Sequence, residues 1–350
     1  MSLATIDLKP GFIDRRLIAE QPQSGALVKI SNPTNIDLVG SQTQTINFEG
    51  EMGIFGEGAT NATDAEKSKT SNDASNGSIT ITPITFHISY RFPKKFLQLF
   101  GVNGYNPSDP TFRAGAPQTM LNNIVSQPYQ AGILEQYQNY VNKAISRALD
   151  YVVLYGVNPK TGKASDVARV NGHLLASTKG AEKIDRTSLT PGNALRAAIA
   201  HASAQGDTAA QGVVTSTFLN DLGSAKTTIG SPAEFASNVP LIGSLVNISG
   251  VTLAASNTVS DNLAAASAGA IQTGETLDGV FGDFTNRFVW GAIPLSGIEV
   301  FDSGNPDGST EGDLGATNKV LLRTEVALGW GFLGGADKFA YVSHTATAGD

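Results

Sequence analysis

The chain has 350 residues, 41% hydrophobic and 16% charged, so it can bury a sizeable core and is long enough for two domains. Its 24 basic and 31 acidic residues give a net charge of −7. This charge argues against a protein that binds the phosphate backbone of double-stranded nucleic acid through a basic patch. The absence of cysteine excludes disulfides and thiolate metal sites. The 38 glycines predict many turns and short strands, and hence a mixed α and β fold.

The first 41 residues predict an extended arm, because Pro10, Pro22 and Pro33 interrupt a segment of scattered apolar residues. Such an arm would expose those side chains unless it folded back or clasped a neighbouring subunit. The first twenty residues lack the continuous hydrophobic region of a signal peptide, and no run approaches the ~20 apolar residues of a membrane span. We therefore expect a protein made in the cytosol.

Two segments rich in β-branched and aromatic residues, 42–56 and 78–92, predict the strands of a long hairpin. The polar segment between them, 57–77, has no apolar residue larger than alanine and predicts a mobile tip. In the second strand the apolar alternation changes phase at Pro83, which predicts a bulge or an edge position there.

Apolar residues at three- and four-residue steps predict a long helix over 128–156, with Pro128 in its first turn and Gly156 at its end. A second helix is predicted by Thr190 as its cap, an alanine-rich run after it and Gly206 as its terminator.

The rest of the chain alternates between strands and shorter segments, which predicts a compact α/β part followed by further strands. A short helix is expected at 218–225 and an Ala/Ser-rich segment, helix or loop, at 264–270. The strands are expected at 212–218, 251–256, 280–282, 287–293, 297–302, 319–328 and 339–343.

Two glycine motifs typical of nucleotide-binding enzymes match this sequence only in part. Gly329-x-Gly331-x-x-Gly334 has the spelling of a dinucleotide fingerprint, but too few residues follow it for a βαβ unit, so we interpret it as a glycine-rich turn. The segment 156–163 resembles a phosphate loop but has Ala164 where a hydroxyl is needed, so it too predicts a turn. The four histidines lack metal-ligand spacing, and no Gly-x-Ser-x-Gly nucleophile motif occurs. No catalytic, cofactor or metal site is expected.

The order of an arm, a long hairpin, a return strand ending SYRFPKKFLQLF and a long helix resembles that of the major capsid proteins of tailed bacteriophages, which have the Hong Kong 97-like fold. The resemblance covers nearly the whole chain. Its other specific parts are GVVTSTFLNDLGSAKT at 212–227 and the segment from GDFTNRFVWGAIPLSGIEVFDS to NKVLLRTEVALGWGFLGGADKFAYVS near the C-terminus.

The resemblance implies an α+β chain built from five parts. These are an N-terminal arm (1–41), an extended β-hairpin called the E-loop (42–93), a peripheral domain (94–189) with a spine helix (128–156), an α/β axial domain (190–296), and a final part (297–350) with return strands of the peripheral domain and a C-terminal strand.

It also implies a structural role. Members of this family assemble into hexamers and pentamers of an icosahedral head shell, which encloses double-stranded DNA without sequence-specific binding. The expected location is the virion, after synthesis in the host cytoplasm. The expected partners are other copies, a separate scaffolding protein, a portal protein and a cement or decoration protein. No enzyme activity, cofactor or membrane is implied.

Some family members crosslink an E-loop lysine to an asparagine of a neighbour, with a glutamate as proton acceptor. The candidates here are Lys67 or Lys69 in the E-loop, and Asn318 and Glu325 seven residues apart. In the alternative interpretation no crosslink forms and Glu325 pairs with Arg323 or another cation.

Three alternative functions predict different properties. An encapsulin, a bacterial compartment shell of the same fold, would be favoured by a helix within residues 1–25. An α/β enzyme would use the turn at Gly329 and bind a cofactor. A phage tail or surface-layer protein would form tubes or flat lattices.

Overall fold

The computed structural model describes residues 25–33, 43–49, 76–93, 128–207, 210–224, 245–248, 250–259, 269–271, 274–295 and 298–345. Its contacts divide the chain into two compact units. The first unit comprises Met1–Ser24, Thr85–Arg147 and Ala292–Leu328, and the second comprises Gly25–Ile84, Ala148–Gly291 and Gly329–Asp350.

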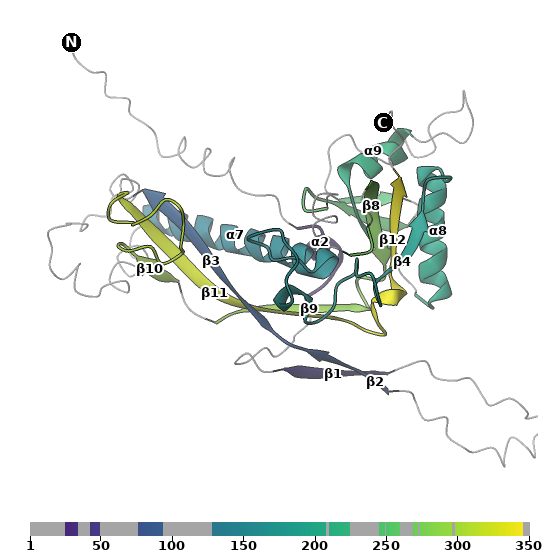
Figure 1. Ribbon diagram of the computed structural model, residues 1–350, viewed down its shortest axis with the longest axis horizontal. Helices are drawn as coiled ribbons and strands as arrows, with labels where there is room; N and C mark the ends of the chain where they lie inside the picture. Colours follow the sequence, from purple (N-terminus) through teal and green to yellow (C-terminus); the bar gives the residue numbers. More distant parts are fainter. Residues whose placement is uncertain are drawn as a thin grey trace, which may run out of the picture. The chain divides into compact units, whose positions relative to one another are not determined.

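The second unit is organised around a six-stranded mixed sheet (Figure 1). Two neighbouring pairs, β4 with β12 and β5 with β7, are parallel, and the other pairs are antiparallel. The mixed α+β class predicted from the sequence is therefore confirmed. In spatial order the strands are β4 (Glu182–Asp185), β12 (Ala340–Thr345), β8 (Glu275–Gly282), β5 (Gln211–Val214), β7 (Val251–Ala255) and β6 (Leu245–Ile248).

Two helices, α8 (Pro191–Ala204) and α9 (Ser216–Ser224), pack on this sheet and enclose a hydrophobic cluster. The predicted cap of α8 is confirmed, since the backbone N–H of Asn193 donates to Thr190 Oγ1 over 3.3 Å. The predicted strand 212–218 is wrong beyond Val214. Thr215 accepts a hydrogen bond from the N–H of Phe218 instead, which starts α9.

A short N-terminal segment packs against β5 and β7 of the same sheet. It forms the four-residue helix α2 (Leu27–Ile30), which in Figure 1 lies on the other side of β8 and β12 from α8. Ala26 and Leu27 are fully buried, and the indole Nε1 of Trp290 donates to Ser31 Oγ over 3.0 Å. Burial of these side chains fixes residues 25–33 within the second unit.

The sheet of the first unit has the order β10-β11-β3, and β9 also pairs with β11. Of these elements β3, β9 and β11, together with the long helix α7, contribute residues to both units. Their bounds are β3 Ile84–Pro93, α7 Pro128–Asp150, β9 Phe288–Pro294, β10 Glu299–Phe301 and β11 Lys319–Phe332.

Within the first unit α7 is attached to the sheet by Tyr137. Its hydroxyl lies 2.8 Å from Thr324 Oγ1 on β11 and donates to the carbonyl of Ile88 on β3 over 3.1 Å. The helix predicted over 128–156 is confirmed as far as Asp150. The next five residues form a π-helical turn, which ends at Gly156 with a φ of 60°.

The predicted hairpin is present as β1 (Gln44–Glu49), antiparallel to β2 (Asn76–Ile81). The predicted tip up to residue 75 lies outside the described residues, as do most of the arm and residues 264–268. At Pro83 the chain makes no bulge but leaves the sheet of β1 and enters that of β11 as its edge strand β3. At this crossing the side-chain amide of Asn171 pairs with both the N–H and the carbonyl of Thr82, each over 2.8 Å.

The glycine-rich turn expected at 329–334 is only partly correct. Strand β11 continues through Gly329 and Gly331 to Phe332, and only Gly334, with a φ of 81°, lies in the turn. A Cβ on Gly331 would stand 2.7 Å from Ile79 Cδ1, so the glycine lets β11 approach β2. None of the helices in the described ranges is long and apolar enough to cross a membrane.

Candidate functional site

Of the four crosslink candidates, the structure describes two, Asn318 and Glu325. Lys67 and Lys69 lie outside the described residues. Asn318 occupies the turn before β11 with a φ of 54°, and Glu325 lies in the middle of that strand. Seven residues of extended strand span roughly 23 Å, so the two side chains could meet at one site only if separate copies supplied them.

The surroundings of Glu325 are those of a surface carboxylate. Its side chain is 38% exposed, and its Oε1 lies 3.9 Å from Nε2 of His87 on β3. Arg323, one of the expected partners, forms an ion pair with Glu299 at 2.8 Å. Burial would raise the pKa of a glutamate and make it a better proton acceptor, whereas this side chain is partly exposed.

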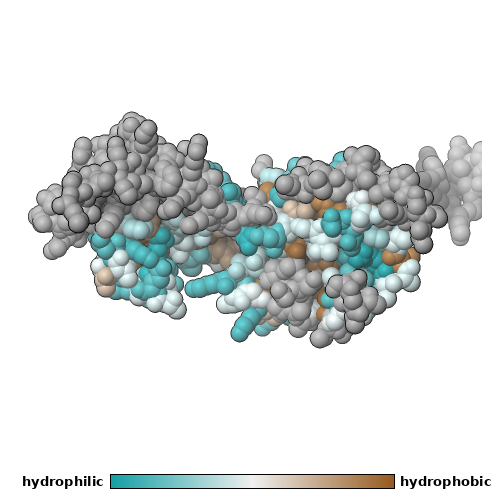
Figure 2. Space-filling model, turned by 90° about the horizontal axis from the view of Figure 1, so that it is seen from above, coloured by the Kyte–Doolittle hydropathy of each residue, from teal (hydrophilic) through white to brown (hydrophobic). Residues whose placement is uncertain are grey.

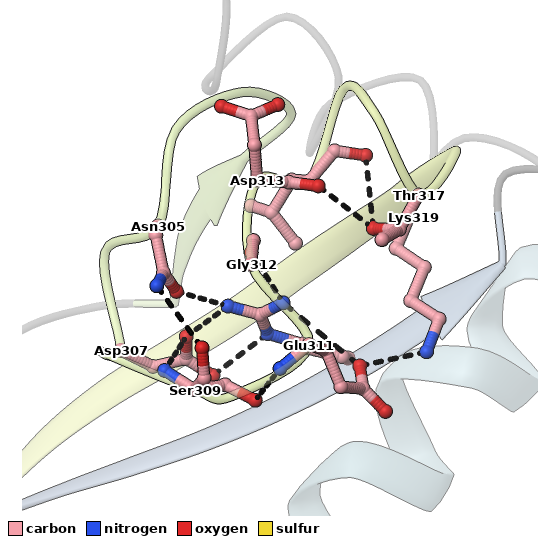
Figure 3. A network of polar contacts seen from close by, with 10 residues as sticks. Asn305, Asp307, Ser309, Glu311, Gly312, Asp313, Thr317 and Lys319 are labelled. Atoms are coloured by element: carbon pink, nitrogen blue, oxygen red, sulfur yellow. Dashed lines mark hydrogen bonds and ion pairs between the residues drawn. The ribbon is translucent and has the colours of Figure 1, made fainter.

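A second polar site lies in the loop before β11, whose residues Asn305, Asp307 and Glu311 are labelled in Figure 3. Arg91 of β3 inserts among these loop residues. Its Nε and Nη2 donate to the two carboxylate oxygens of Asp307, and Nη1 donates to the carbonyl of Gly312 over 2.9 Å. Asn305 accepts a further hydrogen bond over 2.5 Å, and Glu311 lies 3.8 Å away. The Arg91 side chain is only 8% exposed, so it fastens the loop to the sheet.

The charges in this loop stabilise one another. The hydrogen bond from Arg91 lowers the pKa of Asp307, and the same bond raises the pKa of Arg91. In the same loop Leu314 is fully buried and anchors it, and Lys319 donates to Glu311 over 2.7 Å. Since the guanidinium already neutralises these carboxylates, the loop is a braced turn rather than a cation site.

Asp150, at the end of α7, is the most deeply buried carboxylate described. It accepts the backbone N–H groups of Ala26 and Leu27 over 2.5 and 3.0 Å, and the Thr258 hydroxyl also donates to it. Burial raises its pKa to about 6, although these hydrogen bonds and Lys29 act in the opposite direction. Asp150 therefore anchors the N-terminal segment to the second unit by neutral donors.

A third cluster joins four elements of the second unit. Arg186, just after β4, lies 2.8 Å from Asp278 on β8 and 3.1 Å from Asp221 on α9. The imidazole of His344 on β12 lies 3.0 Å from Asp278, and its two ring nitrogens lie 3.1 and 3.4 Å from Arg186 Nη2. Burial raises the pKa of Asp278. The guanidinium of Arg186 occupies the space beside the imidazole, so we interpret the cluster as a structural contact that holds these four elements together.

The other two histidines also have structural surroundings. His173 is buried, which lowers its pKa to about 4, and His201 lies 3.1 Å from Glu182. Among the residues that the structure describes, no group of three or more His, Asp and Glu side chains could hold a metal ion. The Arg91 and Arg186 clusters have no local signal in the sequence, because each arginine lies between 35 and over 200 residues from its partners.

Comparison with solved structures identifies similar folds. A chain from Mycobacterium phage Ogopogo matches with a TM-score of 0.61 and 22% identity over 93% of this chain and 92% of its own. A chain from Mycobacterium phage Bobi matches with a TM-score of 0.55 and 14% identity over 97% and 100%, and one from Gordonia phage Cozz with 0.54 and 16% over 93% and 88%. No protein-family model and no curated protein sequence matches the chain. The predicted resemblance to a bacteriophage chain is therefore confirmed at the level of the fold.

Proposed function

We propose that this chain is the major capsid protein of a bacteriophage, a shell subunit that works by assembling with copies of itself. The observation that carries the proposal is the extent of the fold match. It covers 93% of this chain and 92% of the phage chain, so the likeness extends over nearly the whole length of both chains rather than over one shared module. A fold hosts many functions, so assembly itself has to be tested.

The described residues support a structural role. The polar clusters around Arg91, Asp150 and Arg186 bind the chain's own loops and strands through ion pairs and hydrogen bonds within the chain. In this proposal the parts correspond to the arm, the E-loop, the peripheral domain and the axial domain with the boundaries expected from the sequence. Copies form hexamers and pentamers that enclose double-stranded DNA, with a scaffolding protein, a portal and a decoration protein as partners.

Electron microscopy of the purified chain, expressed alone and with a candidate scaffolding protein, tests the proposal. We expect closed shells or rings of five and six subunits. Tubes or flat lattices would favour a tail or surface-layer protein, and small uniform shells filled with protein would favour an encapsulin. A monodisperse monomer under both conditions would contradict a shell protein of any kind.

Covalent crosslinking stays a prediction. In the expected reaction the amine of Lys67 or Lys69 attacks the side-chain carbonyl of Asn318 on a neighbour, a C–N bond forms, and ammonia leaves, while Glu325 accepts the amine proton. Particles boiled in detergent would then give a ladder of multimers on a gel. Glu325→Gln should abolish the ladder without preventing assembly, and its matched control is Glu299→Gln. A single monomer band from wild-type particles would contradict the crosslink while leaving the shell proposal intact.

A further inference from the structure

One segment of the second unit has a charge opposite to that of the chain as a whole. Residues 156–181, here called the basic loop, connect the end of α7 to β4 and carry four basic residues and one acidic residue, a net charge of +3. Since the whole chain carries −7, its remaining residues carry −10. The basic residues are Lys160, Lys163, Arg169 and Lys179.

The backbone of the basic loop is held in a defined shape. The N–H of Asn158 donates to the carbonyl of Lys163 over 2.8 Å, and the Asn158 side chain accepts the N–H of Lys160 over 2.9 Å. Further along, the Trp330 indole donates to the carbonyl of Gly172 over 2.9 Å. Lys160 and Lys163 are exposed, and within the described ranges neither ammonium forms an ion pair.

The same loop exposes apolar side chains. In the 3₁₀ turn Val167–Arg169, Ala168 is buried and Arg169 Nε donates to the carbonyl of Gly156 over 3.2 Å. Val167 and Val170 remain outside and are 65% and 48% exposed, more than any other large hydrophobic side chain among the described residues. In Figure 2 the described surface is mostly teal and white, with brown, hydrophobic patches among them.

Lys179 shows local backbone strain. Its φ is 56°, in the left-handed region that is unfavourable for a residue with a side chain. Its side chain is exposed. A strained lysine at this position adds a third exposed cation to a loop that already presents Lys160 and Lys163.

We infer that the exposed side of the basic loop is a contact face for a second copy of this chain, which covers Val167 and Val170 and places acidic side chains against Lys160 and Lys163. The inference rests on the proposed function and adds the residues of one interface. Charge complementarity favours a copy of the chain, because every copy carries −10 outside its own basic loop. Nucleic acid would pair with the lysines but would leave the two exposed valines unexplained.

The test uses the full chain and its assembly. Val167→Ser with Val170→Ser should raise the protein concentration needed for half-maximal assembly about tenfold, because two apolar contacts are lost. Lys160→Glu with Lys163→Glu should also weaken assembly, and more strongly at low salt than at high salt. The matched control is Leu189→Ser with Leu295→Ser, which removes two exposed leucines outside the loop. Light scattering gives the assembled fraction, and circular dichroism confirms that each variant is folded.

A labelling experiment tests the contact directly, because the chain has no native cysteine. A Val167→Cys variant should react with a maleimide at least about tenfold more slowly in particles than in free subunits. Equal rates in both states, or unchanged assembly of the valine variant, would overturn this inference alone. Protection that disappears when nuclease removes packaged DNA would assign the face to nucleic acid and also overturn it. If the wild-type chain forms no assembly, the proposed function and this inference both fail.

Discussion

Asp150 in the second unit and Asp307 in the first unit each hold a separate chain segment in place, yet their pKa values move in opposite directions. Asp150 is fully buried and accepts hydrogen bonds from two backbone N–H groups and one hydroxyl, and burial raises its pKa to about 6. Asp307 is bound by the Arg91 guanidinium, which lowers its pKa. Neutral donors thus leave the cost of burying a charge uncompensated, whereas a guanidinium compensates it.

The two carboxylates consequently affect stability over different pH ranges. Asp150 has a folded-state pKa above its ordinary value of 3.8, so its contribution is full below 3.8 and is lost as the pH rises through about 6. Asp307 has a folded-state pKa below 3.8, so its contribution is present above that value and is lost as the pH falls through the lowered pKa.

The largest effect is expected from Asp150→Ala. Removing this carboxylate leaves the N–H groups of Ala26 and Leu27 and the hydroxyl of Thr258 without their acceptor inside the second unit. We expect the free energy of unfolding, measured with urea, to fall by about 3 kcal/mol. Asp150→Asn, which keeps the volume and one acceptor oxygen, should lose less. A fall below about 0.5 kcal/mol for Asp150→Ala would contradict the anchor.

The pH dependence of the wild-type chain gives the next effect. With a folded-state pKa of about 6, Asp150 should make the free energy of unfolding about 1 kcal/mol larger at pH 5 than at pH 7.5. The Asp150→Asn variant lacks this titration and serves as the baseline at both pH values. If wild type and variant differed equally at pH 5 and pH 7.5, Asp150 would have an ordinary pKa.

Tyr137→Phe tests the contribution of a buried polar group that carries no charge, in contrast to the two carboxylates. The change removes the contacts to Ile88 and Thr324, so we expect a loss of about 1 kcal/mol in the free energy of unfolding. The loss should be the same from pH 5 to pH 8, because burial raises the pKa of Tyr137 to about 12. Tyr140→Phe, on the same helix, is the matched control and should have a smaller effect.

The smallest effect on overall stability is expected from Arg91→Ala, whose consequence should be local. Without the guanidinium, residues 305–316 lose the group that fastens them to β3. Their amide hydrogen exchange should speed up by about tenfold, while exchange in the six-stranded sheet stays unchanged. Arg91→Lys keeps the charge but loses the two-pronged contact with Asp307, so it should restore protection only in part. Unchanged exchange at 305–316 would show that Leu314 alone holds the loop.

The elements that the sequence predicted well are those whose signals are local. Thr190 and Gly206 mark the ends of α8, and the strand predicted at 319–328 lies within β11. Thr215 was misassigned because a threonine suits a strand as well as a helix cap, and only the turn of the chain decides between them. Gly331 was assigned to a turn, but a glycine is needed there because the side chain of Ile79 leaves no room for a Cβ. Ile79 lies about 250 residues away in sequence, so no local pattern shows this contact.

The polar sites escaped prediction for a similar reason. The sequence did contain one local sign, since Asp150 stands between apolar residues in ALDYVVLY, where a charge is expected to be buried. Its partners, however, are main-chain N–H groups more than 120 residues earlier, and a backbone donor leaves no trace in residue type. The crosslink candidates were inferred from the family resemblance alone, and their chemistry needs a neighbour that a single chain does not supply.

The amide of Asn171, which pairs with Thr82, also bears on the chemical ageing of the protein. Asn171 precedes Gly172, and an asparagine before glycine is the dipeptide most prone to deamidation, in which the glycine nitrogen attacks the side-chain carbonyl. Here that nitrogen donates to Arg169, and the amide is held at both ends by hydrogen bonds to Thr82, so the two reacting atoms cannot easily align. Deamidation would turn the donor that faces the Thr82 carbonyl into a negative oxygen. The hydrogen bonds to Thr82 thus protect the chain against this reaction at the point where its hairpin ends.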